Sequence, residues 1–295
     1  MSTLQAFDIV SRISERSGQL RLAEQKVAES ILTNLARAAS ASIGDLAAHA
    51  GVSIASVTRF AKAMGCTDVR DFKFRLAQAV AVGQRFLSED QSAAIEAPSE
   101  LADVVLKDIY AVLEVNRALI NPDAVLRAAR MLLDARMIYA FGMGGGSTMM
   151  ADEARYRLMR HARPIATYHD ALLQRMVAAT LDKNDVVLVF STTGNVPELL
   201  ANCAVAKEYG ARLVALTALG SPLAGMADVL LPIRTLETDL IFKPSSSRYA
   251  MMMALDTLVL ELALLQKQRS QELLRRLKYV LDAHRGGGDR QPLGD

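Results

Sequence analysis

The sequence predicts two domains of different fold class. The first is an all-α domain with a helix-turn-helix, and the second is a three-layer α/β domain around a five-stranded parallel sheet. Up to about residue 87 the apolar residues follow helical spacing only, whereas after residue 100 short apolar runs alternate with helical stretches. Strands rich in Val, Leu and Ile that alternate with helices form a parallel sheet covered on both faces, as in flavodoxin-like and Rossmann-like folds. A length of 295 residues fits two domains of about 150.

Composition excludes several classes of protein. With 51% hydrophobic and 22% charged residues the chain is globular, and two cysteines cannot form a disulfide scaffold. The apolar stretch 251–265 is interrupted by Asp256 and Glu261, and the first ten residues have no signal-peptide pattern. We therefore expect a cytoplasmic protein without a membrane partner. The net charge of +2 neither requires nor excludes nucleic acid.

The helices of the first domain, 1–87, follow from apolar spacing and from cap residues. One buried helical face is predicted from residues at three- and four-residue steps: Leu20, Ala23, Val27, Ile31 and Leu35. Ser42 is the expected N-cap of a helix over 43–50 that ends at Gly51, and a second helix over 54–64 ends at Gly65. A further helix is expected over 68–87. The polar stretch 88–100 is predicted to be a linker.

The elements of the second domain, 101–284, alternate along the chain. Two helices come first, over 101–119 and 123–134, the latter started by Asn121 and Pro122. The predicted strands are 137–141, 164–167, 186–190, 212–216 and 229–232. The helices between them are 147–161, 170–180, 196–209 and 222–227, and 246–266 and 270–284 follow. Residues 285–295 are predicted to be a disordered tail.

The segment 43–63 has the spacing of a DNA-binding helix-turn-helix. Ala47 is small where two helices would cross, and Gly51 permits the positive φ of a tight turn. A small core is expected from Leu46, Ala50, Val52, Val57 and Phe60. The residues expected to contact DNA, on or near the outer face of the second helix or at the first helix's cap, are Ser42, Ser53, Ala55, Ser56, Thr58, Arg59 and Lys62.

A plain helical hairpin with a glycine turn is the alternative interpretation of this segment. The short polar and basic second helix favours DNA, because such side chains contact base edges and phosphates. Five basic residues against three acidic ones between 42 and 76 make only a weak patch. We therefore expect a homo-oligomer on a double-stranded operator that is an inverted repeat.

Two loops that each follow a strand and precede a helix are predicted to bind an anionic ligand. Glycine lets backbone approach an anion, hydroxyls donate to it, and the helix N-terminus favours negative charge. The predicted ligand residues are Gly144, Gly146 and Ser147 in the first loop, Ser191, Thr192 and Thr193 in the second, and Ser247 and Arg248 at the start of the later long helix. The first loop lacks the G-x-G-x-x-G spacing of a dinucleotide site. Asn195 and Glu198 are expected to form a capping box.

Catalytic and metal chemistry find little support in the sequence. The four histidines lack metal-ligand spacing, and neither Cys66 nor Cys203 has a C-x-x-C partner. Glu153, Glu198 and Glu237 would be the acid/base candidates if the second domain were an isomerase. We expect no catalytic residue, no metal and no cofactor.

The motifs of both halves resemble those of the RpiR (MurR/RpiR) family of bacterial transcriptional regulators. In the first half the matching residues are Ala23-Glu24, Lys26-Val27-Ala28, Ser42-Ile43, Leu46-Ala47, Gly51-Val52-Ser53, Val57-Thr58-Arg59-Phe60 and Asp71-Phe72-Lys73. The second half is similar to a sugar isomerase (SIS) domain in Phe141-Gly142-Met143-Gly144, Ser191, Thr193-Gly194, Leu216-Thr217, Pro222-Leu223-Ala224 and Ser246-Ser247-Arg248.

This resemblance implies a homodimeric or homotetrameric regulator of carbohydrate catabolism genes, controlled by a phosphorylated sugar or sugar acid in the SIS domain. Two departures remove hydroxyls, since the family usually has Ser where this chain has Gly146 and Thr where it has Val196. An SIS-fold sugar-phosphate isomerase, and a DNA-binding protein whose SIS domain only dimerises, are the alternative functions. The helical domain argues against the isomerase.

Overall fold

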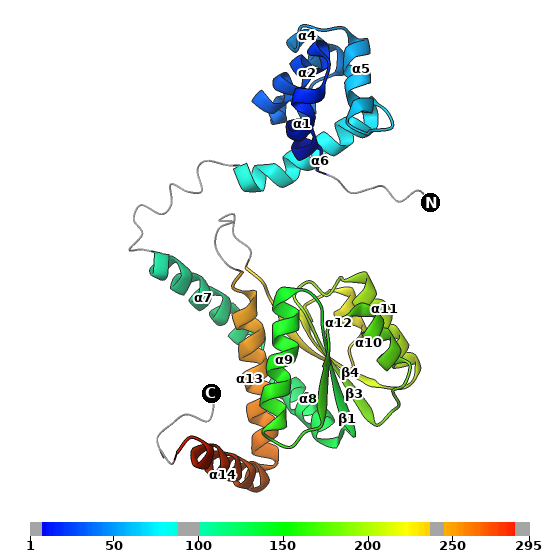
Figure 1. The fold of residues 1–295 in the computed structure, drawn as a ribbon. Helices are drawn as coiled ribbons and strands as arrows, with labels where there is room; N and C mark the ends of the chain where they lie inside the picture. Colours follow the sequence, from blue (N-terminus) through cyan, green and yellow to red (C-terminus); the bar gives the residue numbers. More distant parts are fainter. Residues whose placement is uncertain (1–7, 88–100, 237–244, 287–295) are drawn as a thin grey trace. The chain divides into compact units, whose positions relative to one another are not determined.

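The computed structural model describes residues 8–87, 101–236 and 245–286, and within them the chain forms two compact units (Figure 1). One unit falls within the first 96 residues and the other begins after them. The predicted linker 88–100 lies outside the described residues, as does the predicted tail beyond Gly286.

The N-terminal unit is all helical, as the spacing predicts. Its helices are α1 (Ile9–Arg16), a short 3₁₀ turn η1 (Ser17–Gln19), α2 (Leu22–Thr33), α3 (Leu35–Ser40), α4 (Ile43–His49), α5 (Ile54–Ala63) and α6 (Val69–Leu87). Their apolar faces meet in one core, in which the rings of Phe60 and Phe72 lie edge to face with centroids 5.6 Å apart. α4 and α5 differ from the predicted ranges by one residue at their C-terminal ends.

The second unit is built on a parallel five-stranded sheet in the order β2-β1-β3-β4-β5. The strands are β1 (Met137–Gly142), β2 (Ile165–Tyr168), β3 (Asp185–Ser191), β4 (Arg212–Ala218) and β5 (Val229–Ile233). β3 is buried along its whole length, which explains why its sequence is a continuous apolar run and not an alternating one. The chain leaves β1 for β2 on one side and then returns past β1 to β3 on the other.

Helices cover both faces of this sheet (Figure 1). α8 (Pro122–Asp134), α9 (Gly145–Met159) and α13 (Ser247–Leu265) pack on one face, and α7 (Leu101–Arg117) packs against α13. α10 (Ala171–Ala178), α11 (Pro197–Glu208) and α12 (Pro222–Met226) cover the other face, and α14 (Lys267–His284) follows α13. α11 begins one residue later than a capping box at Asn195 would require. Val196 is its N-cap and no side chain caps it, because Pro197 takes the first helical position. The capping-box prediction is therefore wrong.

No single helix in the described parts of the chain is long and apolar enough to cross a membrane. Only α13 and α14 taken together reach that length and composition, and they are bent by 107° relative to one another.

Candidate functional site: a helix-turn-helix and a switch-point crevice

The turn between α4 and α5 owes its geometry to Gly51. This residue has φ +63°, and the backbone N–H of Val52 donates to the carbonyl of Ala47 at 2.9 Å, which closes the C-terminus of α4. α5 starts two residues later because the hydroxyl of Ser53 accepts from the backbone N–H of Ser56. The turn thus follows from one glycine and one N-cap serine, both visible in the sequence.

Ser42 caps α4 in a complete capping box. Its hydroxyl accepts from the backbone N–H of Asp45 at 3.1 Å, and the Asp45 carboxylate accepts from the backbone N–H of Ser42 at 3.2 Å. The pKa of Asp45 is lowered, first by the hydrogen bond from the Ser42 hydroxyl and then by the one from its N–H. Ser42 is exposed, but its hydroxyl also serves the cap.

The outer face of α5 carries most of the predicted DNA-contacting residues. Ser53, Ala55, Arg59 and Lys62 are exposed and Thr58 is half-buried. Ile54 is 53% exposed beside them and was missed by the sequence interpretation, which gave it no role.

Ser56 corrects the sequence interpretation, because it is 4% exposed and not on the outer face. It lies four residues before Phe60, so helical spacing puts it on the core side. Its hydroxyl is 3.0 Å from that of Ser53 and accepts a hydrogen bond from the Arg59 guanidinium at 3.0 Å. Ser56 therefore orients Arg59 and offers no surface of its own.

Two arginines of α1 hold the C-terminus of α5, a contact that the sequence interpretation missed. Arg12 donates to the carbonyl of Met64 at 3.1 Å and Arg16 to that of Ala63 at 2.9 Å. These carbonyls have no partner within the helix, and positive charge is favourable at this end of the helix dipole. The only local signal is the i, i+4 spacing of the two arginines.

The two hydroxyl-bearing loops of the α/β unit follow neighbouring strands. The first follows β1 and leads into α9, the second follows β3 and leads into α11, and β1 pairs directly with β3. The strand order reverses between these two strands, so their carboxyl ends are the topological switch point of the sheet. Open α/β sheets bind ligands at this place, and we call it the switch-point crevice.

The glycines of the first loop have free space beside them. Gly144 has φ +80° and is the N-cap of α9, and a Cβ added at Gly144, Gly145 or Gly146 would meet no atom within 4 Å. Ser147 is 6% exposed. The space at Gly146 therefore gives an anion access to the first N–H groups of α9.

The second loop is closed on itself. Ser191 is 3% exposed, and its hydroxyl accepts from the backbone N–H of Gly194 at 3.0 Å. The Thr193 hydroxyl accepts from the N–H of Asn195 at 3.3 Å. Thr192 is half-buried and Thr193 exposed. The hydroxyls predicted to bind an anion are thus partly used within the loop.

Ser247 and Arg248 lie in the first turn of α13, which packs beside α9 (Figure 1). Ser247 is 7% exposed and its hydroxyl is 2.7 Å from that of Ser245. The Arg248 guanidinium lies 5.0 Å from the centre of the Tyr249 ring. No hydrogen bond or ion pair joins these two residues to either loop in the described part of the chain.

A polar network at the end of β2 was also missed. Asp152 of α9 accepts from the Thr167 hydroxyl at 3.0 Å, and its other oxygen is 3.2 Å from Nε2 of His169. Arg155 lies 3.5 Å from the same carboxylate. In the sequence His169 pointed to no definite partner, because Asp152 is 17 residues away on another element.

The three glutamates considered as acid/base candidates do not form a common site in the described residues. Glu153 forms an ion pair with Arg157 on α9, Glu198 lies in the first turn of α11, and Glu237 lies outside the described residues. Within residues 8–87, 101–236 and 245–286, no group of three side chains is placed to hold a metal ion.

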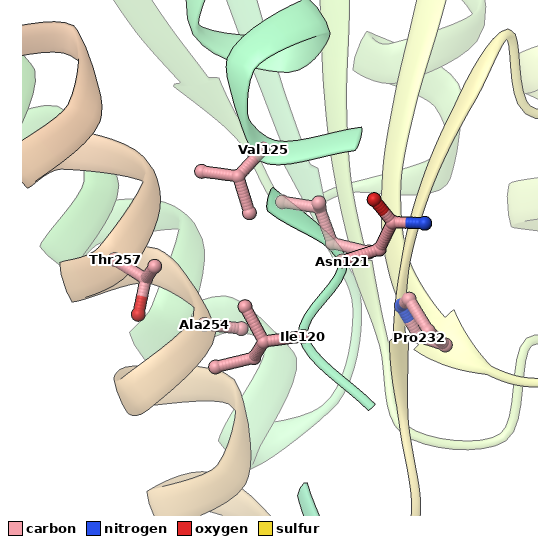
Figure 2. A pocket seen from close by; sticks show the side chains of 7 residues that line it. Ile120, Asn121, Val125, Pro232, Ala254 and Thr257 are labelled. Atoms are coloured by element: carbon pink, nitrogen blue, oxygen red, sulfur yellow. The ribbon is translucent and has the colours of Figure 1, made fainter. Parts of the chain in front are cut away.

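A narrow apolar pocket lies away from the two loops, between the start of α8, β5 and α13 (Figure 2). Figure 2 shows Ile120 and Val125 on the side of α13 that carries Ala254 and Thr257, and Asn121 beside Pro232 of β5. Its free space of about 10 Å³ is that of one water molecule at most, so it does not hold a sugar.

Two family models match the chain, one on each unit. The helix-turn-helix domain of the rpiR family matches residues 7–83, which include α4, α5 and both arginines of α1. The SIS domain matches residues 131–261, which include both loops and the start of α13.

Curated relatives match almost the whole chain. The HTH-type transcriptional regulator HexR of Pseudomonas aeruginosa is 33% identical over 274 residues, which cover 93% of this chain and 95% of that protein. HexR of Escherichia coli K12 is 30% identical over 282 residues, covering 94% and 96%. Among solved structures, the Vibrio vulnificus NanR protein complexed with ManNAc-6P matches with a TM-score of 0.59 and 22% identity, over 93% of this chain and 98% of that one. At this identity the structural match shows the fold.

Proposed function

Because this chain belongs to the RpiR family of helix-turn-helix transcriptional regulators with a SIS domain, we propose that it controls carbohydrate catabolism genes and that a phosphorylated sugar or sugar acid sets its affinity for DNA. One observation carries the ligand part of this proposal. β1 and β3 are neighbours, so the two loops with their glycines, hydroxyls and helix N-termini meet at one switch-point crevice. The NanR protein, a structural neighbour, was solved with such a phosphosugar.

The proposed DNA-binding surface is the outer face of α5 together with the cap of α4. Arg59 and Lys62 supply positive charge, and the exposed Ile54 supplies an apolar contact of the kind that thymine methyl groups accept. The remaining proposed contacts are Ser42, Ser53, Ala55 and Thr58. Ser56 contributes by holding Arg59.

The proposed ligand site is the open first loop with the closed second loop beside it. Gly144, Gly146 and Ser147 offer the start of α9, and Ser191, Thr192 and Thr193 offer hydroxyls. Ser247 and Arg248 complete the site from the start of α13, in the same chain or across the dimer. Gly146 lacks the hydroxyl that the family usually has, but its open surroundings leave backbone N–H groups accessible to phosphate.

We further propose that the protein works as a homo-oligomer on an inverted repeat. One short helix with few basic side chains binds DNA weakly, and two copies match two half-sites about one helical turn apart.

The DNA part is tested with duplexes selected from a random-sequence pool and measured by fluorescence anisotropy. Arg59→Ala is expected to weaken binding by about 1–3 kcal/mol, about 5- to 150-fold. Arg37→Ala, which removes an exposed arginine of α3 outside α4 and α5, is the matched control and is expected to bind like the wild type. Equal affinity of a folded Arg59→Ala protein would remove Arg59 from the surface.

The ligand part is tested by a thermal-shift screen of sugar phosphates and sugar acids. A true ligand is expected to raise the Tm of the wild type, because it binds the folded state only. It is expected to have little effect on Ser191→Ala/Thr193→Ala. If no compound stabilises the wild type, or the double variant responds equally, the SIS domain serves only to dimerise or binds elsewhere.

A further inference from the structure

Thr217, near the end of β4, has a hydroxyl group that the free protein does not use. Its side chain is 0% exposed, and Oγ1 has no hydrogen-bond partner among the residues that the structure describes. Most buried hydroxyls have such a partner, so an exception in a folded protein calls for an explanation. Neither the predicted ligand set nor the comparisons assign Thr217 a role.

The hydroxyl lies against the inner side of the second loop. Thr217 pairs in register with Ser191, where β3 ends and that loop begins. A Cβ added at Gly194 would come within 2.5 Å of Thr217 Oγ1 and within 2.1 Å of the Ser221 hydroxyl. The backbone at Gly194 therefore rests directly on two hydroxyls, and only glycine fits there.

The backbone N–H of Gly194 is hydrogen-bonded within the second loop. This N–H donates to the Ser191 hydroxyl at 3.0 Å, while the Gly194 carbonyl accepts from the N–H of Leu223 at 3.1 Å. An anion in the crevice gains the Gly194 N–H only if that group turns away from Ser191. In a planar trans peptide the N–H and the preceding C=O point in opposite directions.

We propose that Thr217 is a positioning residue of the ligand site, and that its hydroxyl donates to the Thr193 carbonyl when a phosphate ester turns the Thr193–Gly194 peptide. The N–H then faces the anion and the carbonyl faces inward, where Thr217 has a free donor. Gly194 has φ +62°, and glycine accepts both orientations of the peptide at little steric cost. This inference rests on the proposed function, since it needs an anion at the second loop.

Thr217→Val and Thr217→Ser separate this role from a purely structural one. Valine keeps the shape and removes the hydroxyl, so the Tm of the free protein is expected to stay equal or rise. Binding of glucose 6-phosphate, N-acetylmannosamine 6-phosphate and inorganic phosphate is measured by calorimetry for each variant. For whichever probe binds the wild type, valine is expected to weaken binding about 3- to 10-fold, the effect of one hydrogen bond, and serine to restore it.

Thr257→Val on α13 is the matched control, because its hydroxyl donates to the Met253 carbonyl within its own helix. It is expected to leave binding unchanged. Equal binding by Thr217→Val and the wild type would overturn the inference, and so would a Tm loss in Thr217→Val that Thr217→Ser does not share. Failure of every probe to bind the wild type would instead contradict the proposed function, and the inference with it.

Discussion

The recognition helix α5 and the second ligand loop are held in different ways. α5 is fixed at both ends, because Ser53 caps its start and Arg12 and Arg16 of α1 bind carbonyls at its end. Its polar side chains Arg59 and Lys62 are exposed to solvent. In the second ligand loop, by contrast, the hydroxyls accept hydrogen bonds from backbone N–H groups of the same loop, those of Gly194 and Asn195.

This difference distinguishes a preformed surface from one that must exchange hydrogen bonds on binding. A preformed helix binds DNA without the entropy cost of ordering its backbone first. A loop that changes its bonds has two states, and a ligand that favours one of them shifts the population of the whole protein. We therefore expect DNA recognition to be sensitive to what surrounds α5, and ligand response to be sensitive to single atoms at Gly194.

The largest expected effect is the loss of the preformed surface by Phe60→Ala. Phe60 is 0% exposed against Phe72, so its truncation is expected to destabilise the N-terminal unit by about 3–5 kcal/mol. DNA binding should be lost, while the thermal response of the α/β unit to a ligand is retained. Calorimetry resolves the two transitions. A simultaneous loss of the ligand response would contradict this expectation, because it would mean that the two units fold as one.

Gly194→Ala is expected to damage the loop and leave α5 intact. Alanine at φ +62° is strained by about 1–3 kcal/mol, and its Cβ would collide with the hydroxyls of Thr217 and Ser221. We expect loss of phosphate-ester binding by calorimetry, with DNA affinity unchanged in the absence of ligand. Gly225→Ala on α12 is the matched control, since a Cβ there meets no atom within 4 Å and the residue lies outside the proposed ligand site. Similar damage from both substitutions would contradict the account.

Arg16→Ala and Lys62→Ala separate a residue that supports α5 from a residue that contacts DNA. Arg16 binds the end of α5 and not the recognition face, so its loss should leave the slope of log K against log salt unchanged. Lys62 is exposed on the recognition face, and loss of a phosphate contact should reduce the slope of log K against log salt by about 0.9. Anisotropy titrations at four salt concentrations give both numbers. A reduced slope for Arg16→Ala would make Arg16 a phosphate contact.

The smallest expected effect is the lack of thiol reactivity at both cysteines in the folded protein. Burial raises the pKa of Cys203 to about 12, and burial followed by the charge of Asp71 raises that of Cys66. At pH 8 both thiols are therefore protonated and covered, and the thiolate is the reactive form. We expect no labelling by a maleimide in the folded protein and two labels after unfolding. Fast labelling of Cys66 alone would indicate that the region after α5 opens locally and is less rigid than we describe.

Much of the fold followed from the sequence because it rests on local signals. Gly51, Ser42 and Ser53 fix the turn and both helix starts within a few residues of themselves, and the apolar run of β3 marks a buried strand. The pairing of β1 with β3 places the two predicted loops at neighbouring strand ends.

Contacts between distant elements could not be predicted in the same way. Arg12 meets Met64 across 52 residues and Thr217 meets the loop of β3 from another strand, and neither leaves a periodic trace. Ser56 is different, because its spacing from Phe60 already indicated the core side, and its polarity led to the wrong face.

If a ligand at the crevice changes DNA affinity at α5, one coupling free energy links the two sites, and it can be measured from either site. DNA affinity is measured with and without a saturating stabilising ligand, and ligand affinity with and without saturating DNA. The account predicts the same factor in both directions, about 5- to 150-fold, and no change for Ser191→Ala/Thr193→Ala. Equal DNA affinity with and without a ligand that binds the wild type would contradict it.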